Sequence, residues 1–339
     1  MPRFSVIVPT RNRAASLAAA LHAIKRQTCR SYEVIVVDDG SVPECRARYG
    51  DMLASLGDRF QIVCDTPDSS PGRGPSAARN RAISLAQGEF VTFCDDDDLW
   101  LVDDHLEIAS NALSAIPEAD IYYANQEAYR GNNLIDSDRW PQLHGQMERT
   151  ALVGIADVYW LPRAAFMRPG GVAHLNVSIV RRSLFEEIGG FWEQVRYEED
   201  LDFYLRSIDR ARAILFRPTV VARHYAPDLQ RQDNASTRPN TIEKWLVRSM
   251  ICEHVRVSAR TPEVLAQACV IHGYALRHLA TALSHSRQHD AAFIAAAQAL
   301  AVLPGLRWST FVQYLALRRL SARLRVALSP MKTKRAPAI

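Results

Sequence analysis

Four consecutive aspartates directly follow residues 89–94, a run that is typical of a buried β-strand. Packing does not explain this placement, because neighbouring carboxylates repel each other and are costly to bury without a cation. Open α/β sheets bind their ligands at the carboxyl ends of strands, and Mg²⁺ is often shared between one or two carboxylates and a substrate phosphate. The run therefore favours a metal–diphosphate site. The alternative is a solvated acidic turn that caps a helix beginning near residue 103.

Apolar runs alternate with helical patterns through the first half of the chain. Strands are predicted over residues 4–9, 32–37, 60–64, 89–94 and 119–128, and helices over residues 76–86 and 103–116. Strands without polar alternation are typical of a sheet covered on both faces, and the spacing suits right-handed parallel crossovers. The sequence predicts an α/β fold, with a Rossmann-like, mostly parallel sheet and helices on both faces.

The chain has 339 residues, which is long enough for two domains. Residues 129–171 are irregular, as in a binding loop or, equally, a structural insertion. Beyond residue 240 the sequence is alanine-rich and helical, with a helix start at Thr261-Pro262 and a turn around residues 288–290. We expect an α/β domain over residues 1–239 and a helical C-terminal region over residues 240–339.

The six cysteines lack metal-ligand spacing and suit a reducing cytoplasm. A strand begins at once, so we expect no signal peptide, and no apolar run reaches the roughly 18–20 residues that span a bilayer. Eight basic residues and no acidic residue follow Asp290. They interleave with apolar residues, as in a basic amphipathic helix on the cytoplasmic face of an anionic membrane: Phe311, Leu315, Leu320, Leu324 and Leu328. A domain-packing helix with a solvated cationic face is the alternative.

Polar residues stand at the ends of the first two predicted strands, as Pro9-Thr10-Arg11-Asn12 and Asp38-Asp39-Gly40-Ser41. Both should lie at the same sheet edge as the aspartates. A carboxylate there can accept hydrogen bonds from a nucleobase, and the guanidinium fork of Arg11 suits a phosphate. Asp-Asp-Gly-Ser is also a good β-turn, so the joint position carries more weight than either motif.

Four motifs together resemble a family 2 glycosyltransferase: VIVPTRNR at 6–13, VIVVDDGS at 34–41, ARNRAI at 78–83 and GEFVTFCDDDDLW at 88–100. Their order and spacing match that family, and the likeness extends through Arg223-His224. The resemblance implies a GT-A fold and an inverting transfer of a sugar from a nucleotide-diphosphate donor. It covers roughly the first 225–240 residues of the chain.

The resemblance also implies roles for individual residues. Asp97 of the D-x-D motif holds a divalent cation, Mn²⁺ or Mg²⁺, and His224 completes the metal shell, although a structural histidine is the alternative. The run has one aspartate more than the D-x-D motif needs, so the position of the motif is open by one residue. In one alternative, Asp98 caps the next helix. Arg81 stands where relatives commonly carry glycine. The residues implied around the donor nucleoside, diphosphate and sugar are Pro9, Thr10, Arg11, Asp39, Arg79, Asn80, Asp95 and Asp96.

A second acidic cluster at residues 197–202 resembles the Glu-Asp motif of the family, whose aspartate is the general base. This implies that Asp200 removes the acceptor proton, with Glu199 beside it on the substrate. Such a base increases the reaction rate by a factor on the order of 10²–10⁴. The alternative is that these carboxylates stabilise a helix N-terminus. His174 is a further candidate for the acceptor side of the site.

The predicted function is a metal-dependent inverting glycosyltransferase of cell-surface polysaccharide synthesis, with a nucleotide-diphosphate sugar as donor and a glycan or lipid-linked acceptor. We expect no nucleic acid among its partners. A sugar nucleotidyltransferase is one alternative, but it needs a glycine-rich loop where this chain has Pro9-Thr10-Arg11-Asn12. A non-catalytic subunit that binds a nucleotide sugar is another, and the retained acidic residues argue against it.

Overall fold

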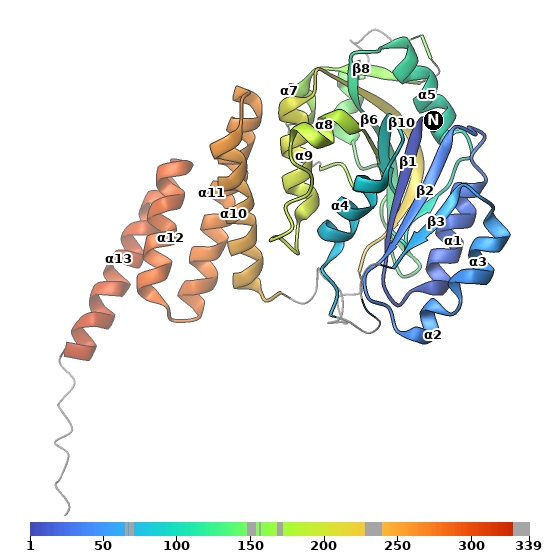
Figure 1. Ribbon diagram of the computed structural model, residues 1–339. Helices are drawn as coiled ribbons and strands as arrows, with labels where there is room; N and C mark the ends of the chain where they lie inside the picture. The colour runs from blue at the N-terminus through green and yellow to red at the C-terminus, as the bar shows by residue number, and fades with distance from the viewer. Residues whose placement is uncertain are drawn as a thin grey trace, which may run out of the picture. The chain divides into compact units, whose positions relative to one another are not determined.

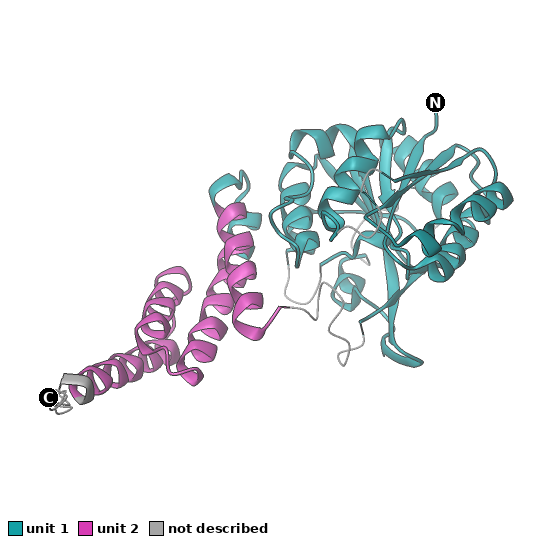
Figure 2. Cartoon of the chain, turned by 60° about the horizontal axis from the view of Figure 1, so that its bottom comes forward, with its two compact units in different colours: residues 1–238, 257–267 teal, residues 239–256, 268–339 magenta. Residues whose placement is uncertain are grey.

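The computed structural model describes residues 1–64, 67, 71–147, 154–155, 157–167, 172–227 and 239–327. The chain forms two compact units (Figure 2). One comprises residues 1–238 and 257–267, and the other comprises residues 239–256 and 268–339. None of the helices among the described residues is both long and apolar enough to cross a membrane.

The first unit is built on a ten-stranded sheet, counted over the described residues, in the order β3-β2-β1-β4-β9-β6-β10-β5, with β7 beside β6 and β8 beside β10. Strands β3 to β4 of this order are parallel, whereas β9 runs antiparallel to both of its neighbours. The strands are β1 (Phe4–Thr10), β2 (Tyr32–Asp38), β3 (Phe60–Val63), β4 (Phe90–Phe93), β5 (Leu99–Trp100), β6 (Ala119–Arg130), β7 (Asn133–Asp136), β8 (Tyr159–Leu161), β9 (Ser178–Arg181) and β10 (Ala213–Tyr225).

Helices cover both faces of this sheet, so its strands are apolar on both sides (Figure 1). Val6 and Val8 of β1 belong to the same buried cluster as Leu17 of α1. On the other face, Phe93 of β4 packs edge-on against Phe203 of α9. The helices of this unit are α1 (Ala14–Lys25), α2 (Pro43–Arg46), α3 (Tyr49–Leu56), α4 (Pro75–Leu85), α5 (His105–Ala115), α6 (His144–Met147), α7 (Arg163–Phe166), α8 (Arg182–Glu187) and α9 (Glu199–Arg210), with 3₁₀ turns at Pro141–Leu143 and Leu175–Val177.

The described part of the region predicted to be irregular, residues 129–171, contains short elements rather than a continuous loop. Trp140, which follows β7, is fully buried against Phe166 of α7 and Phe216 of β10. This ring anchors the segment to the core, as a structural insertion would require. The remaining residues, 148–153, 156 and 168–171, lie outside the described part.

The second unit is helical, and its helices are α10 (Thr241–Ser258), α11 (Pro262–His285), α12 (His289–Val302) and α13 (Leu306–Ala327), of which α10 and α11 also contribute to the first unit. As expected, α11 begins at Pro262 and turns back into α12 just before His289. Gly273 allows a close approach, because a Cβ atom there would lie 2.4 Å from the Cβ of Leu303.

Candidate active site

The loops that follow β1, β2 and β4 meet at one edge of the sheet. The Thr10 hydroxyl donates to Asp96 at 2.7 Å, and the backbone N–H of Asp39 donates to the Thr10 carbonyl at 2.9 Å. Parallel strands bring their carboxyl ends together, as the sequence predicts. Pro9, Thr10, Arg11, Asp39 and the four aspartates therefore belong to one surface.

Asp39 holds the loop before α4. Its two carboxylate oxygens accept the backbone N–H groups of Arg73 and Gly74, each at 2.8 Å. Gly72 has φ +73, and a Cβ atom there would lie 2.5 Å from Asp39 Oδ2. Arg11 donates to the Pro71 carbonyl at 2.6 Å and closes the same loop from the other side. Only glycine at position 72 permits this approach.

Arg13 lies between two of the aspartates. Its guanidinium donates to Asp96 at 3.0 Å and also to Asp97. Burial raises the pKa of Asp97 to about 6, with the charges of Asp96 and Asp95 adding to the effect and Arg13 opposing it. Burial likewise raises the pKa of Asp96. Negative charge at this edge is therefore only partly compensated by the protein. Arg13 was not predicted as a site residue, although it ends the first motif.

Asp98 is buried, and it is bonded to the 3₁₀ turn Leu175–Val177 and to the end of β10 rather than to α5. It accepts from Asn176 at 2.9 Å, from the Tyr225 backbone at 3.1 Å, and lies 3.1 Å from Nδ1 of His224. The alternative that Asp98 caps the next helix is wrong, because Gln27 Oε1 accepts the Leu106 N–H at the start of α5.

His174 and His224 lie beside Asp98, with ring centroids 4.1 Å apart and ring planes tilted by 39°. The three side chains each offer one ligand atom, and these atoms lie within 4.8 Å of one another. Burial lowers the pKa of His174 to about 4, which keeps its imidazole neutral. Burial also disfavours the charged form of His224, but the hydrogen bond and charge of Asp98 raise its pKa overall. One carboxylate and two imidazoles are a plausible donor set for a divalent cation.

Arg79 of α4 joins the two acidic motifs. Its buried guanidinium donates to Asp95 at 2.7 Å and to Glu199 at 2.8 Å. Burial opposes ionisation of Asp95, but the charge and hydrogen bond of Arg79 act together with the nearby histidines and lower its pKa overall, whereas burial raises the pKa of Glu199. This bridge brings the start of α9, and so Asp200, to the edge that carries the four aspartates.

Asp200 stands in the first turn of α9, where its Oδ1 accepts the Leu201 N–H at 2.9 Å. Burial raises its pKa, and the charge of Glu198 adds to that effect. Asn80 is bonded on both sides of its amide to the backbone of Phe191, so it holds the turn before α9. Asp202 is fully buried against Arg206 and has a structural role.

The family model of glycosyl transferase family 2 matches residues 5–185. The chain belongs to glycosyl transferase family 2. The PGL/p-HBAD biosynthesis glycosyltransferase of Mycobacterium bovis (strain BCG / Pasteur 1173P2) is 30% identical over 224 residues, which are 66% of this chain and 77% of that relative. The GalNAc(5)-diNAcBac-PP-undecaprenol beta-1,3-glucosyltransferase of Campylobacter jejuni is 35% identical over 139 residues, which are 41% of this chain and 40% of that enzyme.

Among solved structures, S. aureus TarS 1-349 in complex with UDP-GlcNAc is similar, with a TM-score of 0.63 at 19% identity. The match covers 95% of this chain and 89% of that one. The likeness shows the fold, and the predicted GT-A architecture followed by C-terminal helices is confirmed. The predicted family is likewise confirmed, and this glycosyltransferase carries its acidic residues at the sheet edge described above.

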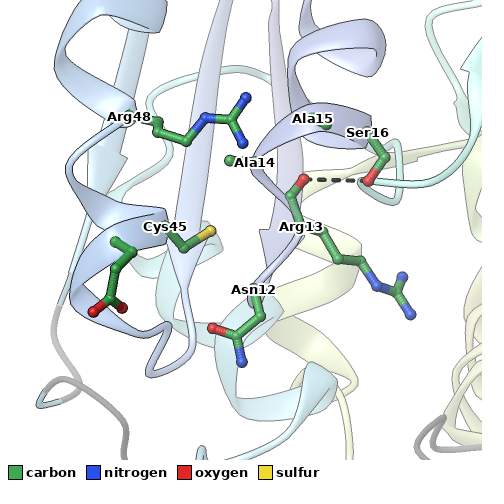
Figure 3. A pocket seen from close by; sticks show the side chains of 8 residues that line it. Asn12, Arg13, Ala14, Ala15, Ser16, Cys45 and Arg48 are labelled. Carbon is green, nitrogen blue, oxygen red and sulfur yellow. Dashed lines mark hydrogen bonds between the residues drawn. The ribbon is translucent and has the colours of Figure 1, made fainter.

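A separate pocket of about 470 Å³ lies beside the start of α1 in this glycosyltransferase (Figure 3). Its lining includes Asn12, Cys45 and Arg48, and none of the residues predicted for donor, metal or base. Figure 3 shows the Arg13 side chain directed away from Arg48 and Cys45. Arg13 therefore borders both this pocket and the acidic sheet edge.

Proposed function

We propose that this glycosyltransferase is metal-dependent and transfers a sugar, with inversion, from a nucleotide diphosphate to a hydroxyl of a saccharide acceptor. The observation that supports this most is the Arg79 bridge between Asp95 and Glu199. It places a candidate base next to a candidate diphosphate site, although the two motifs lie about a hundred residues apart in sequence. A non-catalytic binding subunit has no need of that juxtaposition.

The donor binds at the carboxyl ends of β1, β2 and β4. Pro9, Thr10 and Arg11 line the nucleoside, and Asp39 accepts hydrogen bonds from the base. Asp95 and Asp96 meet the ribose or the sugar. Arg79 contributes positive charge near the diphosphate, and Asn80 fixes the turn that follows α8.

A divalent cation fits the cluster of Asp98, His174 and His224, with Asp97 next to it in the sequence. The chemistry of the donor set supports this, because carboxylate and imidazole groups gather there, burial keeps the His174 imidazole neutral, and the raised pKa of Asp97 marks uncompensated charge. Imidazole ligands favour Mn²⁺ over Mg²⁺. When bound, the cation supplies charge neutralisation for the departing diphosphate. Asp97 and His224 hold it, and Asp98 orients His224.

Asp200 removes the proton from the acceptor hydroxyl as the oxygen attacks the anomeric carbon. Its raised pKa makes it a stronger base than an ordinary aspartate. Glu199 beside it is held by Arg79 and contacts the substrate. A single displacement of this kind inverts the anomeric configuration.

The acceptor that we propose is a lipid-linked saccharide of cell-surface polysaccharide synthesis, met at the cytoplasmic face of a membrane. The Campylobacter relative is named for a substrate on PP-undecaprenol, and the mycobacterial relative for PGL/p-HBAD biosynthesis. The first of these names describes a saccharide on a lipid carrier.

A panel of UDP- and GDP-sugars with Mn²⁺ tests the proposal through release of free nucleoside diphosphate. We expect release with at least one donor, loss of release with EDTA, and loss with Asp200→Asn once a saccharide acceptor is present. Formation of pyrophosphate from a nucleoside triphosphate and a sugar phosphate would instead identify a nucleotidyltransferase. Binding of donors without any turnover would instead support a non-catalytic subunit that binds nucleotide sugars.

A further inference from the structure

Helix α13 has an inner apolar face that packs within its own unit. Leu315 is fully buried in a cluster with residues of α11 and α12, and Phe311 and Val312 pack against the same cluster. Trp308 donates its indole N–H to the Ala296 carbonyl at 2.9 Å. These contacts account for one side of the helix, as the domain-packing interpretation requires.

The opposite side of α13 carries exposed leucines, interrupted by the polar Gln313. We call Leu306, Leu317, Leu320 and Leu324 the outer leucine stripe; their exposed fractions are 90%, 68%, 56% and 52%. At 3.6 residues per turn the four side chains fall within a sector of about 60°, on the side of the helix away from Leu315. The outer face of a helix in a soluble protein is normally polar. Packing within the unit does not explain the stripe.

Arginines flank the stripe on both sides. Arg307 and Arg318 lie along one flank, and Arg323 along the other. Arg319 and Arg323 contact Asp290, the last acidic residue in the chain. Arg318 donates to the hydroxyl of Tyr314, whose ring is itself half-exposed beside the stripe. Residues 291–339 contain eight basic side chains and no acidic side chain.

We propose that the outer leucine stripe of α13 binds an anionic lipid surface, with the leucines in the acyl boundary and the flanking arginines on lipid phosphates. Charge complementarity distinguishes this partner from a second copy of the chain, which would bring one all-cationic helix against another. A purely acidic polymer would engage the arginines but leave the leucines in water. The proposal concerns the helical unit and stands independently of the sugar-transfer reaction.

Vesicle flotation of the full chain tests the proposal. Vesicles of equimolar phosphatidylcholine and phosphatidylglycerol should carry the protein upward, and pure phosphatidylcholine vesicles should carry far less. Leu317→Gln/Leu320→Gln/Leu324→Gln should lower the partition coefficient at least about tenfold. Arg307→Gln/Arg318→Gln should lower it by about tenfold or more on the anionic vesicles, and added salt should weaken the wild type in the same direction.

A matched control removes exposed apolar side chains from other helices of the same unit, as Leu246→Gln/Met250→Gln/Ile294→Gln. This variant should float like the wild type, and thermal melts should show all three variants folded. Equal binding to both vesicle types, or unchanged flotation of the leucine variant, overturns the proposal. So does a concentration-dependent dimer in sedimentation equilibrium that the leucine variant abolishes while the wild type fails to float.

Discussion

The acidic sheet edge and the outer face of α13 depart from the usual distribution of residues in opposite ways. At the sheet edge, carboxylates are buried and bonded to an arginine or a histidine, as Asp96 and Asp98 show. On α13, leucines are exposed. Buried charge and exposed apolar surface are the two departures that most often indicate a partner outside the chain. The comparison teaches that one enzyme can carry two such surfaces, one that needs a partner with positive charge and one that needs an apolar partner.

Removing Arg79 should have the largest effect. Arg79→Met removes a buried guanidinium and leaves the partly buried carboxylates of Asp95 and Glu199 without their shared cation, which should lower the free energy of unfolding by about 3 kcal/mol. Urea unfolding measures this. Arg182→Met, which removes an exposed ion pair with Glu186, is the control and should change stability by less than about 1 kcal/mol. Equal effects of the two variants would show that the bridge does not organise the acidic edge.

Asp200→Asn should lower turnover at least about a hundredfold with little change in donor affinity, because only the general base is lost. Its melting temperature should stay the same or rise. The raised pKa of Asp200 means that its charge costs stability above that pKa, and asparagine removes the charge. Glu186→Gln, which removes an exposed carboxylate of α8, is the control. Turnover close to that of the wild type would exclude Asp200 as the base.

Removing the imidazole at position 224 should weaken metal binding. We expect His224→Ala to raise the dissociation constant for Mn²⁺ by about 10–100-fold, measured by calorimetry or by paramagnetic relaxation of water. His272→Ala, in the second unit, is the control and should leave Mn²⁺ affinity unchanged. An unchanged affinity in His224→Ala would place the cation elsewhere on the acidic edge.

The pH dependence of kcat/KM should reflect the base. Because burial raises the pKa of Asp200 above its ordinary value of 3.8, the rate should fall on acidification before that value is reached, by about tenfold per pH unit below the pKa. The measurement is a profile at saturating Mn²⁺, restricted to the range in which the fold is intact. A rate that stays flat down to pH 4 would contradict this assignment.

The smallest effect is expected on the exposed side of α13. Leu317→Ala should change the free energy of unfolding by less than about 0.5 kcal/mol, whereas Leu315→Ala, on the inner face, should cost about 2–5 kcal/mol. Chemical denaturation of both variants compares the two faces of one helix. A large cost at Leu317 would mean that the outer leucine stripe packs against protein.

Much of the first half of the fold follows from local patterns. The predicted strands at residues 4–9 and 32–37 agree with Phe4–Thr10 and Tyr32–Asp38 to within one residue, because apolar β-branched runs leave little choice. The reversal at β9 was not predicted. Ser178–Arg181 is a short strand between a 3₁₀ turn and α8, and only its pairing with β4 and β6 decides its direction.

Site contacts could be predicted from the sequence where both partners belong to recognisable motifs at the ends of neighbouring strands. Thr10 and Asp96 follow adjacent parallel strands, so their contact follows from topology. The Arg79–Glu199 bridge depends on how α4 and α9 pack, which no local pattern specifies. Asp98 was ambiguous because an aspartate before a helix often caps it. Its true partners, Asn176 and His224, come from distant segments.

The two backbone amides that rest on Asp39 have a consequence for the entry of the donor. If the base is recognised by those same oxygens, then the amides of Arg73 and Gly74 hold the acceptor sites that the base would use. A nucleotide that binds there would displace these amides, and part of its intrinsic affinity would be spent on loop opening. The same competition would favour release of the nucleoside diphosphate, because the loop could return to Asp39.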